Sequence, residues 1–359
     1  MKKKIVTVVG ARPQFIKVAP VSRVLRQQFD EVLVHTGQHY DYNMAGVFFE
    51  ELNIPKPDYN LDVGSGSHGK QTGEMLEKIE QVLLKEKPDG VLVYGDTNST
   101  LAAAIAASKL HIPIFHIEAG LRSFNKKMPE EVNRVLTDHV SSLLFAPTSV
   151  AVNQLASEGI TDGVYAVGDV MYDAFLYNLN IAKEKITLKD FNVNEREYYL
   201  STIHRAENTD NETRLKAIIS ALMEIKETVL LPLHPRTQKK LSNIGLLEKV
   251  KNAKNIKLLE PISYLEMIYL EKYSKGIITD SGGVQKEAYF AHVPCFTLRN
   301  ETEWVETVNV HWNTLVNPTQ EKLNEIVGNY QVVQYVEGIY GDGTASEKIV
   351  QYIDNYFNK

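Results

Sequence analysis

The sequence of 359 residues has a single cysteine and no long apolar run. One cysteine, Cys295, excludes an internal disulfide and a zinc site built from cysteines, and its apolar neighbours favour a buried structural thiol over a nucleophile. No apolar run approaches the roughly 20 residues that a membrane-spanning helix needs. The apolar segment at the N-terminus is too short for a secretory signal. These absences predict a cytoplasmic protein that does not act in a membrane.

The chain also lacks a broad excess of positive charge. Its formal net charge is −6, which argues against a surface for nucleic acid. A Gly-x-x-x-x-Gly-Lys-Ser/Thr sequence is absent, and P-loop chemistry is therefore excluded. With 43% hydrophobic and 23% charged residues the composition is that of a globular protein. The length favours two domains over one.

Short apolar runs rich in β-branched residues alternate with helical patterns along the whole chain. Such runs read as buried parallel strands, and the alternation is typical of doubly wound α/β domains. The strand-like runs of the first half are residues 4–9, 31–35, 90–94, 112–117, 143–146 and 164–167. Those of the second half are residues 198–203, 228–233, 256–259, 276–279, 294–298 and 314–316. Helical patterns in the first half include residues 16–27, 71–84, 100–110 and 130–140.

Polar residues interrupt this rhythm at 183–197, where we place a linker. The sequence therefore predicts a Rossmann-like N-terminal domain of residues 1–182 and a Rossmann-like C-terminal domain of residues 183–344, facing each other across a cleft. The final amphipathic run, within residues 345–359, is expected to pack back on the N-terminal domain.

Charged turns follow several of the predicted strands. Arg12 follows the first strand, Asp96 and Glu118 follow the third and fourth, and Asp280 with Ser281 follows a strand of the second half. Ligands of open α/β sheets bind outside the carboxyl ends of the strands. Cations, carboxylates and a phosphate-type turn are therefore expected at one crevice, which indicates an enzyme that acts on an anionic ligand by proton transfer.

The turn Asp280-Ser-Gly-Gly ends a strand and opens a helical run. Free backbone N–H groups at a helix N-terminus suit a phosphate, and the two glycines would let it approach closely. The alternative is a plain helix cap. Glu287, one turn further along, is placed to reach a ribose hydroxyl. His204 and Arg205 follow another strand and suit a diphosphate, with a solvated turn as the alternative.

The acids of the first half are Asp96, Glu118 and the pair at 130–131. They could serve as general acids and bases, or they could be helix caps and ion-pair members. Glu118 directly follows an apolar strand, and a carboxylate there is costly unless it is partnered. Candidate partners are Arg122, Arg134 and Lys17.

Two other motifs carry little weight. Residues 64–69 match the dinucleotide-binding fingerprint as a pattern, but they follow a polar loop instead of a core strand, so no nicotinamide cofactor is expected. A flexible loop at the mouth of the cleft is the preferred interpretation. His204 and Glu207 have no further ligand at metal-binding spacing, and no metal site is predicted.

Together these turns resemble the non-hydrolysing UDP-N-acetylglucosamine 2-epimerase family along nearly the whole chain. The matching segments are residues 10–17, 36–39, 95–97, 118–122, 129–134, 204–205 and 280–283, with Glu287. The resemblance implies an α/β protein of GT-B type with UDP held mainly by the C-terminal half, no cofactor, and a homodimer. It also implies an isomerase that supplies a precursor for surface polysaccharide.

The reaction that the resemblance implies is elimination of UDP to a bound 2-acetamidoglucal, followed by re-addition with the C2 proton delivered to the other face. The implied catalytic residues are Asp96, Glu118, Glu130 and His204. The implied substrate-binding residues are Arg12, Lys17, Arg134, Ile262, Met267, Ser281, Gly282, Gly283, Glu287 and Trp304. Within this set Glu287 would contact the ribose, and the backbone near Ile262 and Met267 the uracil.

The chain departs from the usual family pattern at Ala11, Gln14 and Phe15, after Gln38-His39, and at Trp304, where the family usually has arginine. These features resemble the branch that acts on UDP-2,3-diacetamido-2,3-dideoxy-glucuronate. Trp304 is expected to stack on a sugar or N-acetyl group, and an anionic C5 substituent would then need Arg122 or Arg134.

Other function classes stay open from the sequence. A GT-B glycosyltransferase would share the architecture and the UDP site. A hydrolysing epimerase would release free UDP, and a nucleotide-sugar sensor would not turn over. The acids of the first half favour the epimerase.

Overall fold

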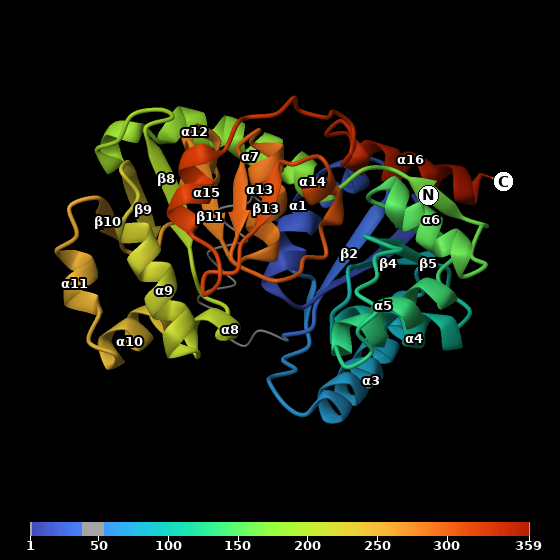
Figure 1. Cartoon of the computed structure of the whole chain (residues 1–359). Coiled ribbons are helices and arrows are strands. Elements are labelled where there is room, and N and C mark those ends of the chain that lie inside the picture. Colours follow the sequence, from blue (N-terminus) through green and yellow to red (C-terminus); the bar gives the residue numbers. More distant parts are fainter. Residues whose placement is uncertain (1, 38–53, 359) are drawn as a thin grey trace. The chain divides into compact units, whose positions relative to one another are not determined.

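The computed structural model describes residues 2–37 and 54–358, with the side chain of Arg12 outside the described part. The chain separates into two compact units (Figure 1). One consists of residues 1–176 and 337–359, and the other of residues 177–336. The domain boundaries near 182 and 344 stay predictions. Each unit is a parallel sheet with helices on its faces, as the alternating pattern predicts.

The first unit has a seven-stranded sheet in the order β3-β2-β1-β4-β5-β6-β7, in which all neighbouring strands pair in parallel. The strands are β1 (Lys4–Val9), β2 (Asp30–His35), β3 (Tyr59–Asn60), β4 (Gly90–Tyr94), β5 (Ile114–Ile117), β6 (Leu143–Ala146) and β7 (Val164–Ala166). The sequence analysis missed β3, because two residues are too few to show an apolar alternation.

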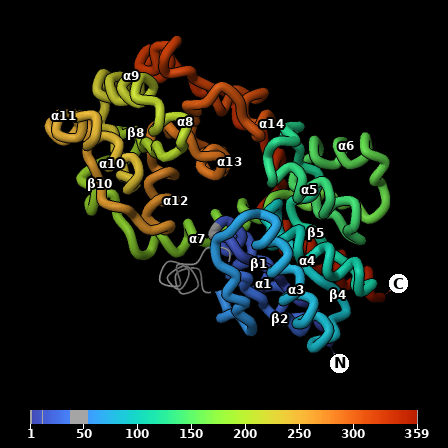
Figure 2. The backbone as a smooth tube through the Cα atoms, turned by 90° about the horizontal axis from the view of Figure 1, so that it is seen from below, coloured from blue at the N-terminus to red at the C-terminus, as the bar shows by residue number. Residues whose placement is uncertain are grey.

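Helices cover both faces of this sheet. They are α1 (Arg12–Gln28), α3 (His68–Glu86), α4 (Asn98–Lys109), α5 (Pro129–Val140), α6 (Ser149–Ser157), α7 (Val170–Lys185), whose second half belongs to the other unit, and α16 (Ala345–Phe357). Helices α3 and α4 run side by side (Figure 2), and α4 turns an alanine-rich face to the buried valines of β1 and β4. Helix α16 packs against α1, and Phe357 contacts the rings of Phe29 and Phe115.

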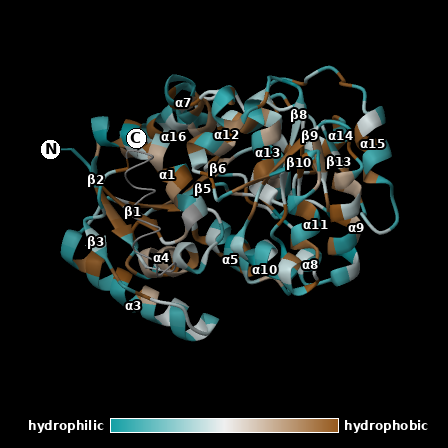
Figure 3. Cartoon of the chain, turned by 90° about the vertical axis from the view of Figure 1, so that its left-hand side faces the viewer, coloured by the Kyte–Doolittle hydropathy of each residue, from teal (hydrophilic) through white to brown (hydrophobic). Residues whose placement is uncertain are grey.

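The second unit has a six-stranded parallel sheet in the order β10-β9-β8-β11-β12-β13. Its strands are β8 (Tyr198–Thr202), β9 (Thr228–Pro232), β10 (Ile256–Leu259), β11 (Gly276–Thr279), β12 (Cys295–Thr297) and β13 (Asn313–Leu315). All six were predicted from apolar runs, and the strands are hydrophobic between helices with hydrophilic outer sides (Figure 3).

The connecting segments of the second unit are mostly short helices. They are η1 (Leu188–Phe191), α8 (Ala206–Thr209), α9 (Glu212–Met223), α10 (Pro235–Asn243), α11 (Leu247–Lys251), α12 (Tyr264–Tyr273), α13 (Gly282–Phe290), α14 (Val305–Asn309) and α15 (Leu323–Asn329). None of the helices in the described part of the chain has the length and apolar character to cross a bilayer.

Both sheets reverse their strand order between two central neighbours, β1 and β4 in the first unit and β8 and β11 in the second. Ligands of doubly wound folds bind at such switch points, beyond the carboxyl ends of the strands. Asp96 lies just beyond β4, and His204 and Asp280 lie just beyond β8 and β11. The turns that the sequence predicted to carry catalytic or binding residues therefore lie at the switch point of each unit.

Candidate active site

Glu118 forms an ion pair with Lys17, one of the three partners proposed for it. Glu118 lies just beyond β5 and Lys17 lies in α1, and each side chain is 11% exposed. The backbone of Glu118 is in the left-handed region at φ 72°, which costs a non-glycine residue about 1–3 kcal/mol. A carboxylate kept in a strained turn beside a buried ammonium is positioned for chemistry or for a ligand.

Gly95 brings the neighbouring turn close to this ion pair. Its φ is +61°, and a Cβ built there would lie 3.0 Å from Oε2 of Glu118 and 3.5 Å from Nζ of Lys17. A side chain at this position would therefore crowd the pair. Glycine lets the turn that carries Asp96 approach it, and it also adopts the left-handed conformation without strain.

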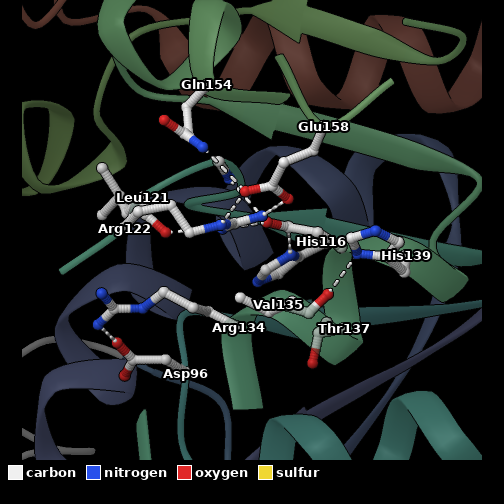
Figure 4. Close-up of polar contacts among 12 residues, drawn as sticks. Asp96, His116, Leu121, Arg122, Arg134, Val135, Thr137, His139, Gln154 and Glu158 are labelled. Carbon is white, nitrogen blue, oxygen red and sulfur yellow. Dashed lines mark hydrogen bonds and ion pairs between the residues drawn. The ribbon is translucent and has the colours of Figure 1, made fainter. Parts of the chain in front are cut away.

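Asp96 is paired with Arg134, whose guanidinium points at it from α5 (Figure 4). The other end of the guanidinium is 3.0 Å from the carboxylate of Glu131, which also accepts the backbone N–H groups of Ser123 and Phe124. Burial opposes ionisation of Glu131, but these hydrogen bonds and Arg134 outweigh it and lower its pKa. Arg134 thus fixes the Asp96 side chain to the start of α5.

Glu130 is placed differently from its neighbour Glu131. Glu130 is exposed in the first turn of α5, whereas Glu131 is 3% exposed and turned inward. Among the described residues no hydrogen bond or ion pair holds the Glu130 carboxylate. The two adjacent acids therefore differ in environment, with Glu131 fixed in the loop 123–131 and Glu130 accessible.

The guanidinium of Arg122 is engaged by two carboxylates of the first unit. Its Nε and Nη2 are each 2.7 Å from the Glu158 carboxylate, and its Nη1 is 2.7 Å from Asp138. Figure 4 shows the guanidinium turned toward Glu158, and only 2% of the side chain is exposed. The two carboxylates of Asp138 and Glu158 already neutralise Arg122, which argues against the suggestion that it receives an anionic sugar substituent.

Gln14 connects two turns through its side-chain amide. In the sequence it stood out only as a departure from the family pattern. Its side-chain oxygen accepts the N–H groups of Gly10 and Ala11, at 2.8 and 3.0 Å. Its side-chain nitrogen donates to the carbonyl of Tyr94 at 2.8 Å. An amide can do both, and Gln14 thereby ties the turn after β1 to the turn after β4.

In the second unit, Asp280 supports the turn that carries His204. Asp280 is fully buried and accepts the backbone N–H groups of His204 and Arg205, at 3.1 and 3.0 Å. It also accepts a side-chain hydrogen bond from Asn208, and Nδ1 of His204 is 3.4 Å from its carboxylate. Asp280 therefore holds the backbone of the turn at His204 and Arg205 from inside the unit.

Ser281 caps α13, as the alternative interpretation of this turn proposed. Its Oγ accepts the N–H of Val284 at 3.5 Å, and its N–H donates to Thr279. Gly283 is exposed, and Gly282 is half-buried. The backbone of the two glycines is thus accessible at the helix N-terminus.

A carboxylate that the sequence analysis missed lies at this helix N-terminus. A Cβ on Gly282 would be 2.5 Å from Oε1 of Glu303. The Glu303 carboxylate is 2.9 Å from Arg299 and 4.0 Å from Arg205. An anionic group between two guanidinium groups and a helix N-terminus marks this place as favourable for negative charge.

His234 is a second missed residue. It follows β9, caps α10 by accepting the N–H of Arg236, and its ring centroid is 5.7 Å from that of His204. The carboxyl ends of β8, β9 and β11 thus bring two imidazoles and the α13 turn to one edge. The sequence marks His234 in the same way as His204, as a polar residue at the end of a predicted strand. Because proline follows it, His234 was interpreted as an ordinary helix start.

Glu287 lies on α13, is 6% exposed, and has another acid close by. Glu271 of α12 is fully buried, and neither of its carboxylate oxygens has a hydrogen-bond partner among the described residues. Burial, and next the charge of Glu287, raise the pKa of Glu271 well above its usual value. Burial beside a second acid therefore disfavours the charged form of Glu271.

The remaining predicted binding residues lie around α12 and α14. Ile262 precedes the Ser263 cap of α12 and Met267 lies in its first turns, both half-buried. Trp304 precedes α14, is 6% exposed, and has Nζ of Lys286 4.1 Å from its ring centroid. Arg12 begins α1, but its side chain lies outside the described residues.

Within the described chain, no group of three or more His, Cys, Asp or Glu side chains could hold a metal ion.

Comparison with known proteins adds independent evidence. Residues 23–354 match the family model described as UDP-N-acetylglucosamine 2-epimerase. A UDP-N-acetylglucosamine 2-epimerase homolog of Methanococcus maripaludis is 57% identical over 98% of this chain and 99% of its own. The UDP-2,3-diacetamido-2,3-dideoxy-D-glucuronate 2-epimerase of Pseudomonas aeruginosa is 50% identical, with 98% and 99% covered.

The fold is also similar to solved structures. The Methanocaldococcus jannaschii UDP-GlcNAc 2-epimerase in complex with UDP-GlcNAc and UDP superposes with a TM-score of 0.85 at 49% identity. The match covers 98% of this chain and 99% of that one.

Proposed function

The chain belongs to the UDP-N-acetylglucosamine 2-epimerase family, and we propose that it inverts C2 of a UDP-2-acetamido sugar. The substrate is UDP-N-acetylglucosamine or its 2,3-diacetamido-glucuronate analogue, since relatives named for each are about equally similar to this chain. The observation that carries the proposal is the pair of acids beyond β4 and β5, each held by its own cation.

The reaction proposed is elimination and re-addition. A base removes the C2 proton while the C1–O bond breaks and UDP leaves with its electron pair, which gives a 2-acetamidoglucal. A proton then adds to the opposite face of C2, and the UDP oxygen re-forms the bond to C1. The steps need an acid and a base, for which we propose Asp96, Glu118 and Glu130. Each step moves a proton and makes or breaks the C1–O bond without transferring a hydride, so this route needs no redox cofactor.

We assign UDP to the second unit. Backbone N–H groups of Ser281, Gly282 and Gly283 suit the diphosphate at the N-terminus of α13, and His204 stands at the neighbouring strand end. Glu287 is assigned to the ribose, and the backbone near Ile262 and Met267 to the uracil. Arg12, Lys17 and Arg134 remain candidates for substrate contacts in the first unit. We also propose that the protein is cytoplasmic, because its proposed substrate is a nucleotide sugar.

The proposed function is tested by incubating the protein with UDP-N-acetylglucosamine alone, and separately with the diacetamido-glucuronate analogue. We expect the C2 epimer of at least one of them without added NAD and without an acceptor. Free UDP that accumulates with turnover would identify a hydrolysing epimerase. Loss of UDP-sugar only when a sugar acceptor is added would identify a glycosyltransferase.

Trp304 is proposed to set the preference for the bulkier C3 substituent. We expect Trp304→Arg to lower the kcat/KM ratio of the diacetamido-glucuronate to the plain substrate by about tenfold, the order of one lost apolar contact. The new guanidinium would also meet Lys286, whose Nζ is 4.1 Å from the ring centroid, so a lower melting temperature is expected. Trp304→Phe keeps an aromatic face for Lys286 and serves as the control. An unchanged ratio in Trp304→Arg would make Trp304 a packing residue only.

A homodimer is the second part of the proposal. Met128, Val132 and Leu136 are spaced four residues apart at the start and along α5, and they are 37%, 44% and 45% exposed. Side chains at this spacing share one helix face. We propose that a second copy of the chain covers this face.

Leu136→Glu is expected to convert the dimer to a monomer, because a charge buried without a partner opposes association. The molar mass measured by light scattering after size exclusion would show it. Val150→Glu, at a position 48% exposed on α6, is the matched control and should stay dimeric. A monomeric wild type, or a dimeric Leu136→Glu variant, would contradict this face.

A further inference from the structure

His116 is a buried ring between two hydrogen-bond acceptors. It lies in β5 with no exposed surface. Its Nδ1 is 2.7 Å from Oδ1 of Asp138, and its Nε2 is 2.8 Å from the backbone oxygen of Gly95. A backbone carbonyl has no hydrogen to donate, and an ionised carboxylate has none. Both ring nitrogens are therefore placed as donors.

Asp138 is the ionised partner that this arrangement requires. Its second oxygen, Oδ2, accepts from Nη1 of Arg122 at 2.7 Å and from the N–H of Gly120 at 3.1 Å. Burial opposes its ionisation, but His116 and Arg122 outweigh burial and lower the pKa of Asp138. Glu158, which is 23% exposed, accepts from the far side of Arg122.

The ring connects two turns that carry proposed acids. Gly95 precedes Asp96, and it is held to β5 both by His116 and by its own N–H, which donates to the carbonyl of Ile117 at 2.9 Å. Asp138 holds Gly120, two residues beyond Glu118. A single imidazole thus links the backbone of the Asp96 turn, through one carboxylate, to the backbone of the Glu118 turn.

We propose that His116, as a buried imidazolium, is a positioning residue that fixes the turns of Asp96 and Glu118 relative to each other. The catalytic consequence rests on the proposed function, because inversion of one carbon needs an acid and a base at fixed places around it. A displacement of about 1 Å at a reacting group can cost on the order of 10²-fold in rate. His116 acts through its hydrogen bonds to Gly95 and Asp138.

The first test measures whether each ring nitrogen of His116 carries a hydrogen, in the wild-type protein without substrate. In protein with ¹⁵N-labelled histidine, both ring nitrogens of His116 are expected to show one-bond coupling to hydrogen at neutral pH. Its resonances are assigned with the His116→Gln and Asp138→Asn variants. In Asp138→Asn the ring should lose its second hydrogen, because the counter-charge is gone. A wild-type ring with one bare nitrogen at neutral pH would overturn the inference, whatever the enzyme's substrate proves to be.

The second test separates positioning from binding. Glutamine carries both of its donor hydrogens on one nitrogen, which cannot occupy the positions of both ring nitrogens. His116→Gln is therefore expected to lower kcat by roughly 10- to 100-fold. UDP affinity measured by calorimetry should stay within about twofold of the wild type, because UDP is assigned to the other unit. His111→Gln, at an exposed position in the turn after α4, is the matched control and should keep the wild-type kcat. A wild-type kcat in His116→Gln, or equal losses of kcat and UDP affinity, would overturn the positioning role.

Discussion

Replacing Glu118 with glutamine is expected to lower kcat by about 10²- to 10⁴-fold, the range for a lost general acid or base, while UDP still binds. Glutamine keeps the shape of the side chain but cannot exchange a proton with C2. It also leaves the ammonium of Lys17, 11% exposed, without its carboxylate. Asp96→Asn should act in the same direction, since it removes the carboxylate paired with Arg134.

Steady-state kinetics with calorimetric UDP binding would measure this effect. Removing one partner of a buried ion pair can cost about 3–5 kcal/mol of folding free energy, so melting temperatures must show that each variant is folded at the assay temperature. Glu74→Gln is the matched control, because Glu74 is paired with Lys78 at 2.8 Å on the surface of the same unit. If Asp96→Asn, Glu118→Gln and Glu130→Gln all kept near-normal turnover, these acids would be caps and ion-pair members only.

Replacing His204 with alanine is expected to weaken UDP binding by roughly 10- to 100-fold. The ring stands at the carboxyl end of β8, is 40% exposed, and is oriented by the buried Asp280. A hydrogen bond to a charged group contributes about 1.5–3 kcal/mol, and each 1.4 kcal/mol is about tenfold in affinity. Ser281→Ala should have a smaller effect in the same direction, because the Ser281 hydroxyl is shared with the cap of α13.

Calorimetry with UDP measures both variants, and His139→Ala in the other unit is the control. Unchanged UDP affinity in both His204→Ala and Ser281→Ala would mean that the diphosphate does not bind at the N-terminus of α13.

The sequence predicted every described strand except β3, and the turns beyond them, because buried parallel strands leave a strong apolar pattern and the topology follows from their alternation with helices. It did not predict which side chains meet. Lys17, Arg122 and Arg134 were equal candidates for Glu118, and only the order of neighbouring strands decides that Lys17 reaches it while Arg122 turns to Glu158.

Other roles depend on side-chain direction, which a single sequence does not encode. Asp280 was expected in a phosphate turn, and it instead supports His204 and Arg205 from within the sheet. Glu303 was overlooked because its neighbour Trp304 drew the comparison with the family. His116 gave no signal, since a histidine in an apolar strand reads as core until its two partners are known.

The most direct test of the central claim is proton NMR of the epimerisation in deuterated water. Elimination and re-addition remove the C2 hydrogen and return one from solvent, so we expect the product epimer to carry deuterium at C2 and to form without added NAD. A product that retains the original C2 hydrogen would contradict elimination and with it the assignment of Asp96 and Glu118.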